Sequence, residues 1–211
     1  MEDRELLPIL ESLLFVAGEP ITVDRLRGVL EGIEGERILK ALTELRDRYS
    51  KQDHGLQVVE VAGGYQIVTR PECAPWLKRL EKVKSAVRLS KPALETLAIV
   101  AYKQPVIRTE IEQIRGVDSM GVLKTLLERH LIKIIGRREA MGRPMMYGTT
   151  REFLIYFGLK NLTDLPTLRD FQELAQVEGE GMDETIQSEQ GEFVKSIGVQ
   201  EEMSLETQAT S

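Results

Sequence analysis

An internal repeat is the strongest constraint that this 211-residue sequence places on its fold. Residues 8–17 (PILESLLFVA) return as residues 92–101 (PALETLAIVA), with six of ten positions identical at an offset of 84. Residues 38–44 match residues 122–128 at the same offset. Two matches at one spacing indicate a tandem duplication of a unit of about 80 residues, which is enough for a small domain. The two copies should therefore share one fold.

The first copy predicts three helices followed by a β-hairpin. Apolar residues recur at helical spacing, and Thr22 is a suitable helix N-cap. Two β-rich runs surround the pair Gly63-Gly64, as expected for a tight turn that needs positive φ. The expected elements are helices over residues 5–17, 22–30 and 36–49 and strands over residues 56–62 and 65–69. A segment over residues 71–83 predicts a linking helix.

The second copy repeats this order. Ser90, Thr109 and Ser119 are suitable N-caps for its three helices. The expected elements are helices over residues 90–103, 109–115 and 119–130, strands near 131–135 and 145–149, and a last helix over 151–157. A basic loop over residues 136–143 joins the strands. Three helices followed by a hairpin is the order of a winged-helix domain, so two such domains are expected in tandem.

The expected fold class is therefore α+β, mainly α, with two tandem winged-helix domains and an acidic C-terminal tail. The expected boundaries are residues 1–70 for domain 1, 71–89 for the linking helix, 90–166 for domain 2 and 167–211 for the tail. Residues 171–211 hold ten acidic residues against one basic residue, Lys195, and their apolar residues are scattered. This composition predicts disorder, because too little apolar surface is available to offset chain entropy.

The formal net charge of −6 hides an uneven distribution. Residues 171–211 carry −9, so the rest of the chain carries +3, and residues 84–150 alone carry +6. The acidic total therefore describes the tail, and it does not exclude an anionic partner for the second domain.

Several classes of protein are disfavoured by what the sequence lacks. A single cysteine, Cys73, rules out an internal disulfide framework and fits a reducing compartment. The longest purely apolar run, residues 97–102, is far shorter than the roughly 20 residues of a membrane span, and the acidic N-terminus lacks the basic head of a secretory signal. No phosphate-loop, metal-binding or nucleophile–base pattern occurs, and His54 and His130 lie in separate units. We expect a cytoplasmic protein without catalytic residues, metal or cofactor.

The third helix of each copy is a poor candidate for reading DNA bases. One face of residues 119–130 is predicted to face the core, and it comprises Met120, Val122, Leu123, Leu126 and Leu127. The opposite face carries two basic residues, one acidic residue, a threonine and a glycine, whereas a reading helix presents Arg, Lys, Asn or Gln. A DNA-binding regulator that uses the basic second domain remains the alternative. Its loop arginines, Arg137, Arg138 and Arg143, could bind phosphate or an acidic partner, or simply be solvated.

The first helix of each copy is more apolar than a surface helix requires. In residues 5–17 the apolar side chains span about half the circumference, against a stripe of about 100° on an ordinary surface helix. In residues 92–103, Ile99 lies on the side opposite to most of the apolar face. Such helices are covered on more than one side, either by the rest of the chain or by a partner, most simply a second copy. The candidate dimer-interface residues are Leu6, Leu10, Leu13 and Leu14.

Longer motifs resemble a known family. The similar segments are residues 13–22 (LLFVAGEPIT), 97–116 (LAIVAYKQPVIRTEIEQIRG), 142–150 (GRPMMYGTT) and 153–159 (FLIYFGL). They resemble signature segments of segregation and condensation protein B. The resemblance extends from the start of the chain to residue 166 and leaves the acidic tail outside.

The resemblance implies two winged-helix domains, a homodimer formed through the first, and no enzymatic activity. It also implies that the dimer binds the kleisin subunit, segregation and condensation protein A. Through the kleisin it would act with the structural-maintenance-of-chromosomes ATPase in chromosome condensation and partition, and so in the cell cycle and cell division. DNA would be contacted at most indirectly, at the nucleoid, and no membrane is implied. The candidate kleisin- or phosphate-binding residues are Tyr102, Arg137, Arg138, Arg143 and Tyr147.

Overall fold

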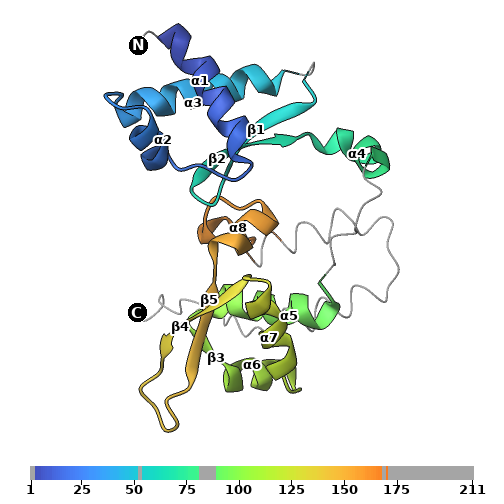
Figure 1. Cartoon of the computed structure of the whole chain (residues 1–211). Helices are drawn as coiled ribbons and strands as arrows, with labels where there is room; N and C mark the ends of the chain where they lie inside the picture. Colours follow the sequence, from blue (N-terminus) through green and yellow to red (C-terminus); the bar gives the residue numbers. More distant parts are fainter. Residues whose placement is uncertain (1–2, 52–53, 81–88, 168–169, 171–211) are drawn as a thin grey trace, which may run out of the picture.

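The computed structural model describes residues 3–51, 54–80, 89–167 and 170 (Figure 1). The fold is mixed helix and sheet and mainly helical. Its buried apolar side chains form two separate clusters, one in each half of the chain. The elements around these clusters are denoted the first unit, residues 3–69, and the second unit, residues 89–165.

The first unit packs three helices against a two-stranded antiparallel sheet. Its elements are α1 (Asp3–Ala17), α2 (Val23–Val29), α3 (Gly35–Ser50), β1 (Leu56–Val61) and β2 (Gly64–Thr69). Thr22 caps α2 as expected, because its hydroxyl accepts a hydrogen bond from the Arg25 N–H at 3.3 Å. Helices α1 and α3 supply most of the core, in which Leu10 and Leu42 are completely buried.

The hairpin turn differs by one residue from the prediction. The strand register pairs Val61 with Gly64, so the two turn residues are Ala62 and Gly63, with φ of 50° and 69°. Positive φ at both positions is typical of the type I′ turn, which fits the twist of the strands. Gly64 lies in β2, where a Cβ would approach the backbone of Ile21 to 2.8 Å. The glycine pair thus meets two requirements, a left-handed turn and a close backbone approach.

The second unit repeats this order and extends it. Its elements are α5 (Lys91–Lys103), β3 (Val106–Ile107), α6 (Arg108–Arg115), α7 (Met120–Glu128), β4 (Ile132–Arg137), β5 (Met145–Thr149), α8 (Arg151–Phe157) and the 3-10 helix η2 (Leu162–Asp164). Strand β3, which the sequence did not predict, makes a three-stranded sheet of order β3-β5-β4. The expected Thr109 cap is wrong, because α6 already begins at Arg108. There the Glu110 carboxylate accepts a hydrogen bond from the Ile107 N–H at 3.0 Å.

The first helix of the second unit is buried by its own unit. Leu97, Ile99 and Val100 lie on different sides of α5 and are at most 1% exposed. They pack in one cluster with Phe153 of α8, so the cover comes from the same unit. Met120 behaves differently from the prediction that it faces the core. It is 61% exposed, because it is the first residue of α7.

Between the units the chain forms the 3-10 helix η1 (Pro71–Cys73) and α4 (Ala74–Leu80). The predicted linking helix is therefore present up to residue 80, and residues 81–88 lie outside the described part. Figure 1 shows α8 on the side of the second unit that faces the first unit. The predicted disordered tail falls on residues 171–211, which also lie outside the described residues.

Candidate interaction surfaces

The apolar residues of α1 divide between the core and the surface. Leu6, Leu10 and Leu14 are at most 1% exposed and fill the first core. This corrects the expectation that they line a dimer interface, because a side chain covered by its own core offers no area to a partner. Of the four candidates, Leu13 alone lies at the edge of the core and is partly exposed.

The most exposed apolar residues of α1 are not among the four interface candidates. Phe15 and Val16 are 70% and 82% exposed. Val16 lies one helical turn from the partly exposed Leu13, whereas Phe15 lies on another side of the helix. The three residues are denoted the α1 surface. The composition of the helix showed that it is too apolar for one buried stripe, but only the packing shows which residues are left over.

A hydrogen bond fixes α1 on α3. The Tyr49 hydroxyl donates to the Glu11 carboxylate, and the Tyr49 ring packs against His54 with the ring centroids 5.2 Å apart. The hydrogen bond to Glu11, with burial, raises the pKa of Tyr49 to about 12. His54 therefore has a packing contact beside the first core.

The loop arginines of the β4–β5 hairpin lie in two different environments. Arg138 forms an ion pair with Glu110 of α6 through both guanidinium nitrogens, one of which lies 3.2 Å from Oε2. The hydrogen bond from Arg138 lowers the pKa of Glu110, and the same contact raises the pKa of Arg138. Arg138 is therefore a tie between the hairpin and α6 rather than a free cation.

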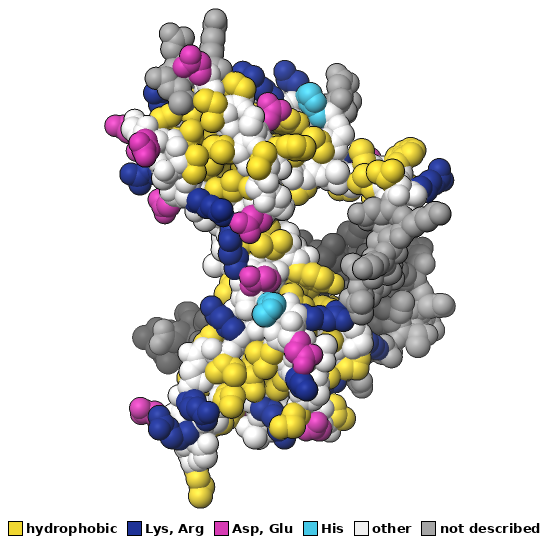
Figure 2. Space-filling model, viewed as in Figure 1, with side chains coloured by type: hydrophobic (Ala, Val, Ile, Leu, Met, Phe, Trp, Pro, Cys, Tyr) yellow, Lys and Arg dark blue, Asp and Glu magenta, His cyan; other side chains and the backbone are white. Residues whose placement is uncertain are grey.

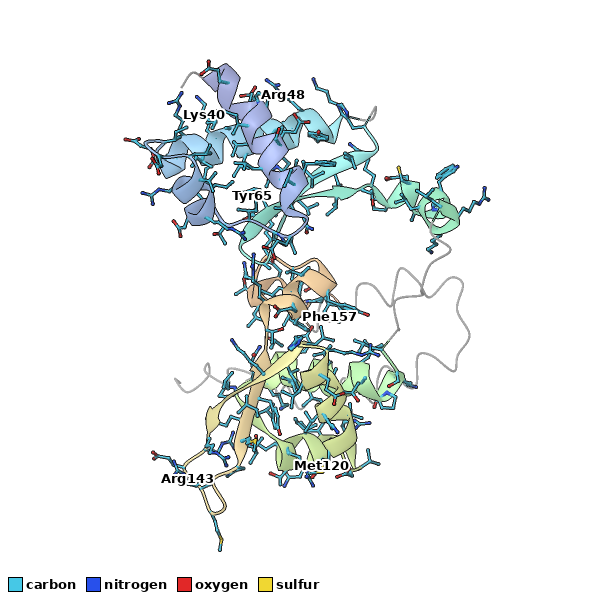
Figure 3. All side chains as sticks on the ribbon, viewed as in Figure 1. Lys40, Arg48, Tyr65, Met120, Arg143 and Phe157 are labelled. Carbon is cyan, nitrogen blue, oxygen red and sulfur yellow. The ribbon has the colours of Figure 1, made fainter. Side chains whose placement is uncertain are left out.

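Arg137 and Arg143 are exposed near the end of the hairpin. The Arg137 guanidinium donates to the Arg143 carbonyl at 3.1 Å, and Met141 at the tip is fully exposed. Figure 2 shows basic side chains gathered at this end of the molecule, and Figure 3 labels Arg143 on the protruding hairpin. Two of the three candidate arginines are thus available to an anionic partner.

The two candidate tyrosines make contacts with other parts of the same chain. The Tyr102 hydroxyl donates to the Pro166 carbonyl at 2.7 Å. Tyr147 is 9% exposed, because it lies in the central strand β5 between Val106 of β3 and Ile134 of β4. The structure therefore does not bring the five candidates into one site.

The third helix of the second unit presents a mixed and largely neutralised surface. Lys124 and Glu128 form an ion pair at 3.9 Å on α7. In the adjoining α6, Arg108 pairs with Glu112 at 2.7 Å and with Asp118 at 3.5 Å. These acids compete for the cations that phosphate binding would need. The surface agrees with the prediction that this helix is a poor DNA reader.

The described residues contain no group of three or more His, Cys, Asp or Glu side chains placed to hold a metal ion. Among the same residues, no helix has the length and apolarity needed to span a membrane. His130 follows α7 with a φ of 56°, and its carbonyl accepts a hydrogen bond from the Thr150 hydroxyl. Cys73 lies 3.8 Å from the Gly55 carbonyl.

The molecule has two repeated units, an apolar surface on α1 and an exposed basic hairpin. These features are typical of a protein that binds other macromolecules. The family model described as "Segregation and condensation complex subunit ScpB" matches residues 8–168, and the chain belongs to this family.

Two relatives show how much of the chain the family covers. A segregation and condensation protein B from Desulforamulus reducens is 52% identical over 82% of this chain and 93% of the relative. A protein of the same name from Syntrophotalea carbinolica is 47% identical over 83% of this chain and 88% of the relative. The comparisons give no support to a DNA-binding regulator.

Solved structures are also similar. ScpB from Mycobacterium tuberculosis is 34% identical and covers 75% of this chain and 98% of its own, with a TM-score of 0.37. A dimer of a ScpB N-terminal domain, complexed with a ScpA peptide, is 31% identical and covers 36% of this chain and 95% of its own, with a TM-score of 0.35.

Proposed function

We propose that this chain is a non-enzymatic scaffold subunit in bacterial chromosome condensation and segregation. It forms a homodimer and binds the kleisin subunit, segregation and condensation protein A. Through the kleisin it acts with the structural-maintenance-of-chromosomes ATPase in the cytoplasm, at the nucleoid. The observation that carries this proposal is the family match over residues 8–168.

The proposal includes the fold of the two units. The orders α1-α2-α3-β1-β2 and α5-β3-α6-α7-β4-β5 support two winged-helix domains, residues 1–70 and 90–166, joined by residues 71–89. The acidic segment over residues 167–211 follows as a tail.

The α1 surface supports a dimer through the first unit. Phe15 and Val16 expose apolar side chains on a helix whose Leu6, Leu10 and Leu14 are already buried in the first core. Burying such side chains against a second copy removes apolar area from water. We therefore propose that the dimer interface includes Leu13, Phe15 and Val16.

The exposed hairpin supports a contact with an acidic segment of a partner. Arg137 and Arg143 are exposed and can form charge-assisted hydrogen bonds with carboxylates, whereas Arg138 is paired with Glu110. Among the candidates for kleisin binding, these two arginines therefore offer the accessible charges, while the Tyr102 hydroxyl is bonded to Pro166 and Tyr147 is buried.

The deciding experiment is the mass of the full chain in solution, alone and mixed with the kleisin, by light scattering after size exclusion. The dimer mass is expected alone and a larger complex in the mixture. Phe15→Lys with Val16→Lys should give the monomer mass, because two cations would be buried face to face. The matched control is Val29→Lys, which replaces a 58% exposed residue on α2 of the same unit and should leave the dimer intact.

Two results would contradict the proposal at different points. A chain that forms a dimer but never associates with the kleisin would overturn the scaffold function. A dimer that survives the double substitution would place the interface elsewhere than the α1 surface.

A further inference from the structure

The turn between β1 and β2 contacts the segment that follows α8, across the two units. The Ala62 N–H donates to the Leu159 carbonyl at 2.9 Å, and the Gly63 N–H donates to the Lys160 carbonyl at 3.0 Å. Two successive backbone donors thus meet two successive backbone acceptors that lie about a hundred positions later in the sequence. In Figure 1 the end of this hairpin points to the loop beside α8.

The turn is half buried where a hairpin tip is usually exposed: Ala62 is buried and Gly63 is exposed. Val61 and Ala62 are 4% and 8% exposed, yet neither belongs to the apolar cluster of the first unit. A two-residue turn directs the N–H groups of its central residues away from the strands, and buried donors need acceptors. The segment after α8 supplies both the cover and the acceptors.

Residues 158–160, whose carbonyls accept these hydrogen bonds, are held in place by contacts within the second unit. Gly158 ends α8 in the left-handed conformation, with φ of 68°. The Leu159 N–H then donates to the Leu154 carbonyl at 2.9 Å, and the Lys160 N–H donates to the Asp164 carboxylate at 2.9 Å. Because both amide donors bond within the second unit, the two carbonyls face outward together.

Two side-chain contacts flank this backbone pairing. Lys160 Nζ lies 3.1 Å from Glu60 Oε2, and Arg151 Nη2 donates to the Pro20 carbonyl at 2.6 Å. The lysine and the carboxylate are 52% and 32% exposed, so the ion pair alone is weak. With the two backbone hydrogen bonds and the buried side chains of Val61 and Ala62, it makes a small and specific interface.

We infer that the tip of the β1–β2 hairpin is a docking surface whose occupant is residues 158–160 of the same chain. This docking fixes the orientation of the second unit relative to the first. The first hairpin is thereby closed to outside partners, whereas the β4–β5 hairpin stays accessible. The inference does not depend on the dimer or on the kleisin, so it can fail while the proposed function stands.

Zero-length carbodiimide coupling of the full-length chain tests which segments meet. It forms an amide, with loss of water, only between amines and carboxylates in contact. A Glu60–Lys160 cross-link within one chain is expected, and Lys124–Glu128, at 3.9 Å, serves as the internal reference pair. Dimers mixed from ¹⁴N- and ¹⁵N-labelled chains distinguish linkage within a chain from linkage between chains. Linkage only between chains, or none while the reference pair reacts, overturns the inference.

Distances between spin labels test whether the docking fixes the orientation. Lys40→Cys on α3 and Lys124→Cys on α7, in a Cys73→Ser chain diluted with unlabelled protein, report on the two units of one protomer. A single narrow distance peak is expected. Arg151→Ala with Lys160→Glu should abolish that peak, because the second change places two carboxylates together.

Charge exchange supplies the matched control. Adding Glu60→Lys to Lys160→Glu restores opposite charges and should restore the narrow peak, while Lys133→Glu, at an exposed position of β4, should leave the peak unchanged. If the peak is unaffected by Arg151→Ala with Lys160→Glu, in protein whose circular dichroism is unchanged, the docking does not hold the units.

Discussion

The Tyr49 hydroxyl of α3 donates a hydrogen bond to the Glu11 carboxylate of α1, thirty-eight positions earlier in the sequence. This contact joins the two helices that supply most of the first core. The position of α1, and therefore of the α1 surface, depends on whether the Tyr49 hydroxyl is protonated.

Stability at alkaline pH should report this bond. The pKa of Tyr49 is raised from 10.0 to about 12, so the folded state holds the phenolic proton more tightly than the unfolded state. The resulting stabilisation is complete below pH 10 and is lost as the pH rises towards 12. Urea unfolding between pH 8 and 12 should show a steeper loss for the native chain than for Tyr49→Phe. Parallel curves would show that Tyr49 does not contribute.

At neutral pH, Tyr49→Phe should lower the free energy of unfolding by about 1 kcal/mol or somewhat more, because a hydrogen bond to a charged acceptor is lost. The comparison is Tyr156→Phe, which changes an exposed hydroxyl on α8 and should have no measurable effect. Equal effects of the two changes would contradict the role given to Glu11.

The ion pair between Arg138 and Glu110 should be visible in the titration of the carboxylate. The guanidinium lowers the pKa of Glu110, and the stabilisation is therefore present above the ordinary pKa and lost as the pH falls through the lowered one. In Arg138→Ala the pKa of Glu110 should rise, as followed by carbon-detected NMR. Arg137→Ala, which removes an exposed arginine of the same hairpin, should leave the pKa of Glu110 unchanged.

Gly64 should tolerate no side chain. In Gly64→Ala the new Cβ would meet the Ile21 backbone, and we expect a loss of about 1–3 kcal/mol in urea unfolding. Gly28→Ala in α2 has open space around the added methyl group and should instead gain about 0.5–1 kcal/mol. A neutral Gly64→Ala would mean that β2 can move away from Ile21 at no cost.

Buried and exposed apolar residues of α1 should respond differently to substitution when the stability of the monomer and the strength of the dimer are measured. Leu14→Ala removes a buried side chain and should cost about 2–5 kcal/mol of stability. Val16→Lys changes an exposed one and should leave the monomer's stability nearly unchanged while weakening the dimer. The opposite pattern would return Leu14 to the interface and place Val16 in the core.

Much of the fold was predictable because it depends on local sequence. Thr22 marks the start of α2, and the paired glycines mark the first hairpin, since capping and left-handed turns depend on a few neighbouring residues. Because the sequence is duplicated, the same elements could be predicted for the second copy. Strand β3 escaped notice, because two residues give no periodicity and its pairing with β5 is a contact of distant segments.

The interaction surfaces were harder to predict. Helical spacing placed Leu14 and Val16 on one broad apolar arc, and only tertiary packing decides that the first is buried and the second exposed. Likewise, Arg137 and Arg138 are neighbours in one basic loop, yet Glu110 occupies only the second. The local sequence decides which side of a helix is apolar. The tertiary structure decides which of those apolar residues are covered by neighbouring elements.

The two hairpins differ in the length of their connections, and this sets where the chain can grow. Ala62 and Gly63 alone join β1 to β2, so one inserted residue would break the register that brings Gly64 onto Ile21. The connection from Arg137 to Met145 is longer and ends in solvent at Met141, where added residues cost only slightly more loop entropy. A tag or a foreign peptide belongs at Met141, and evolutionary length variation should accumulate there.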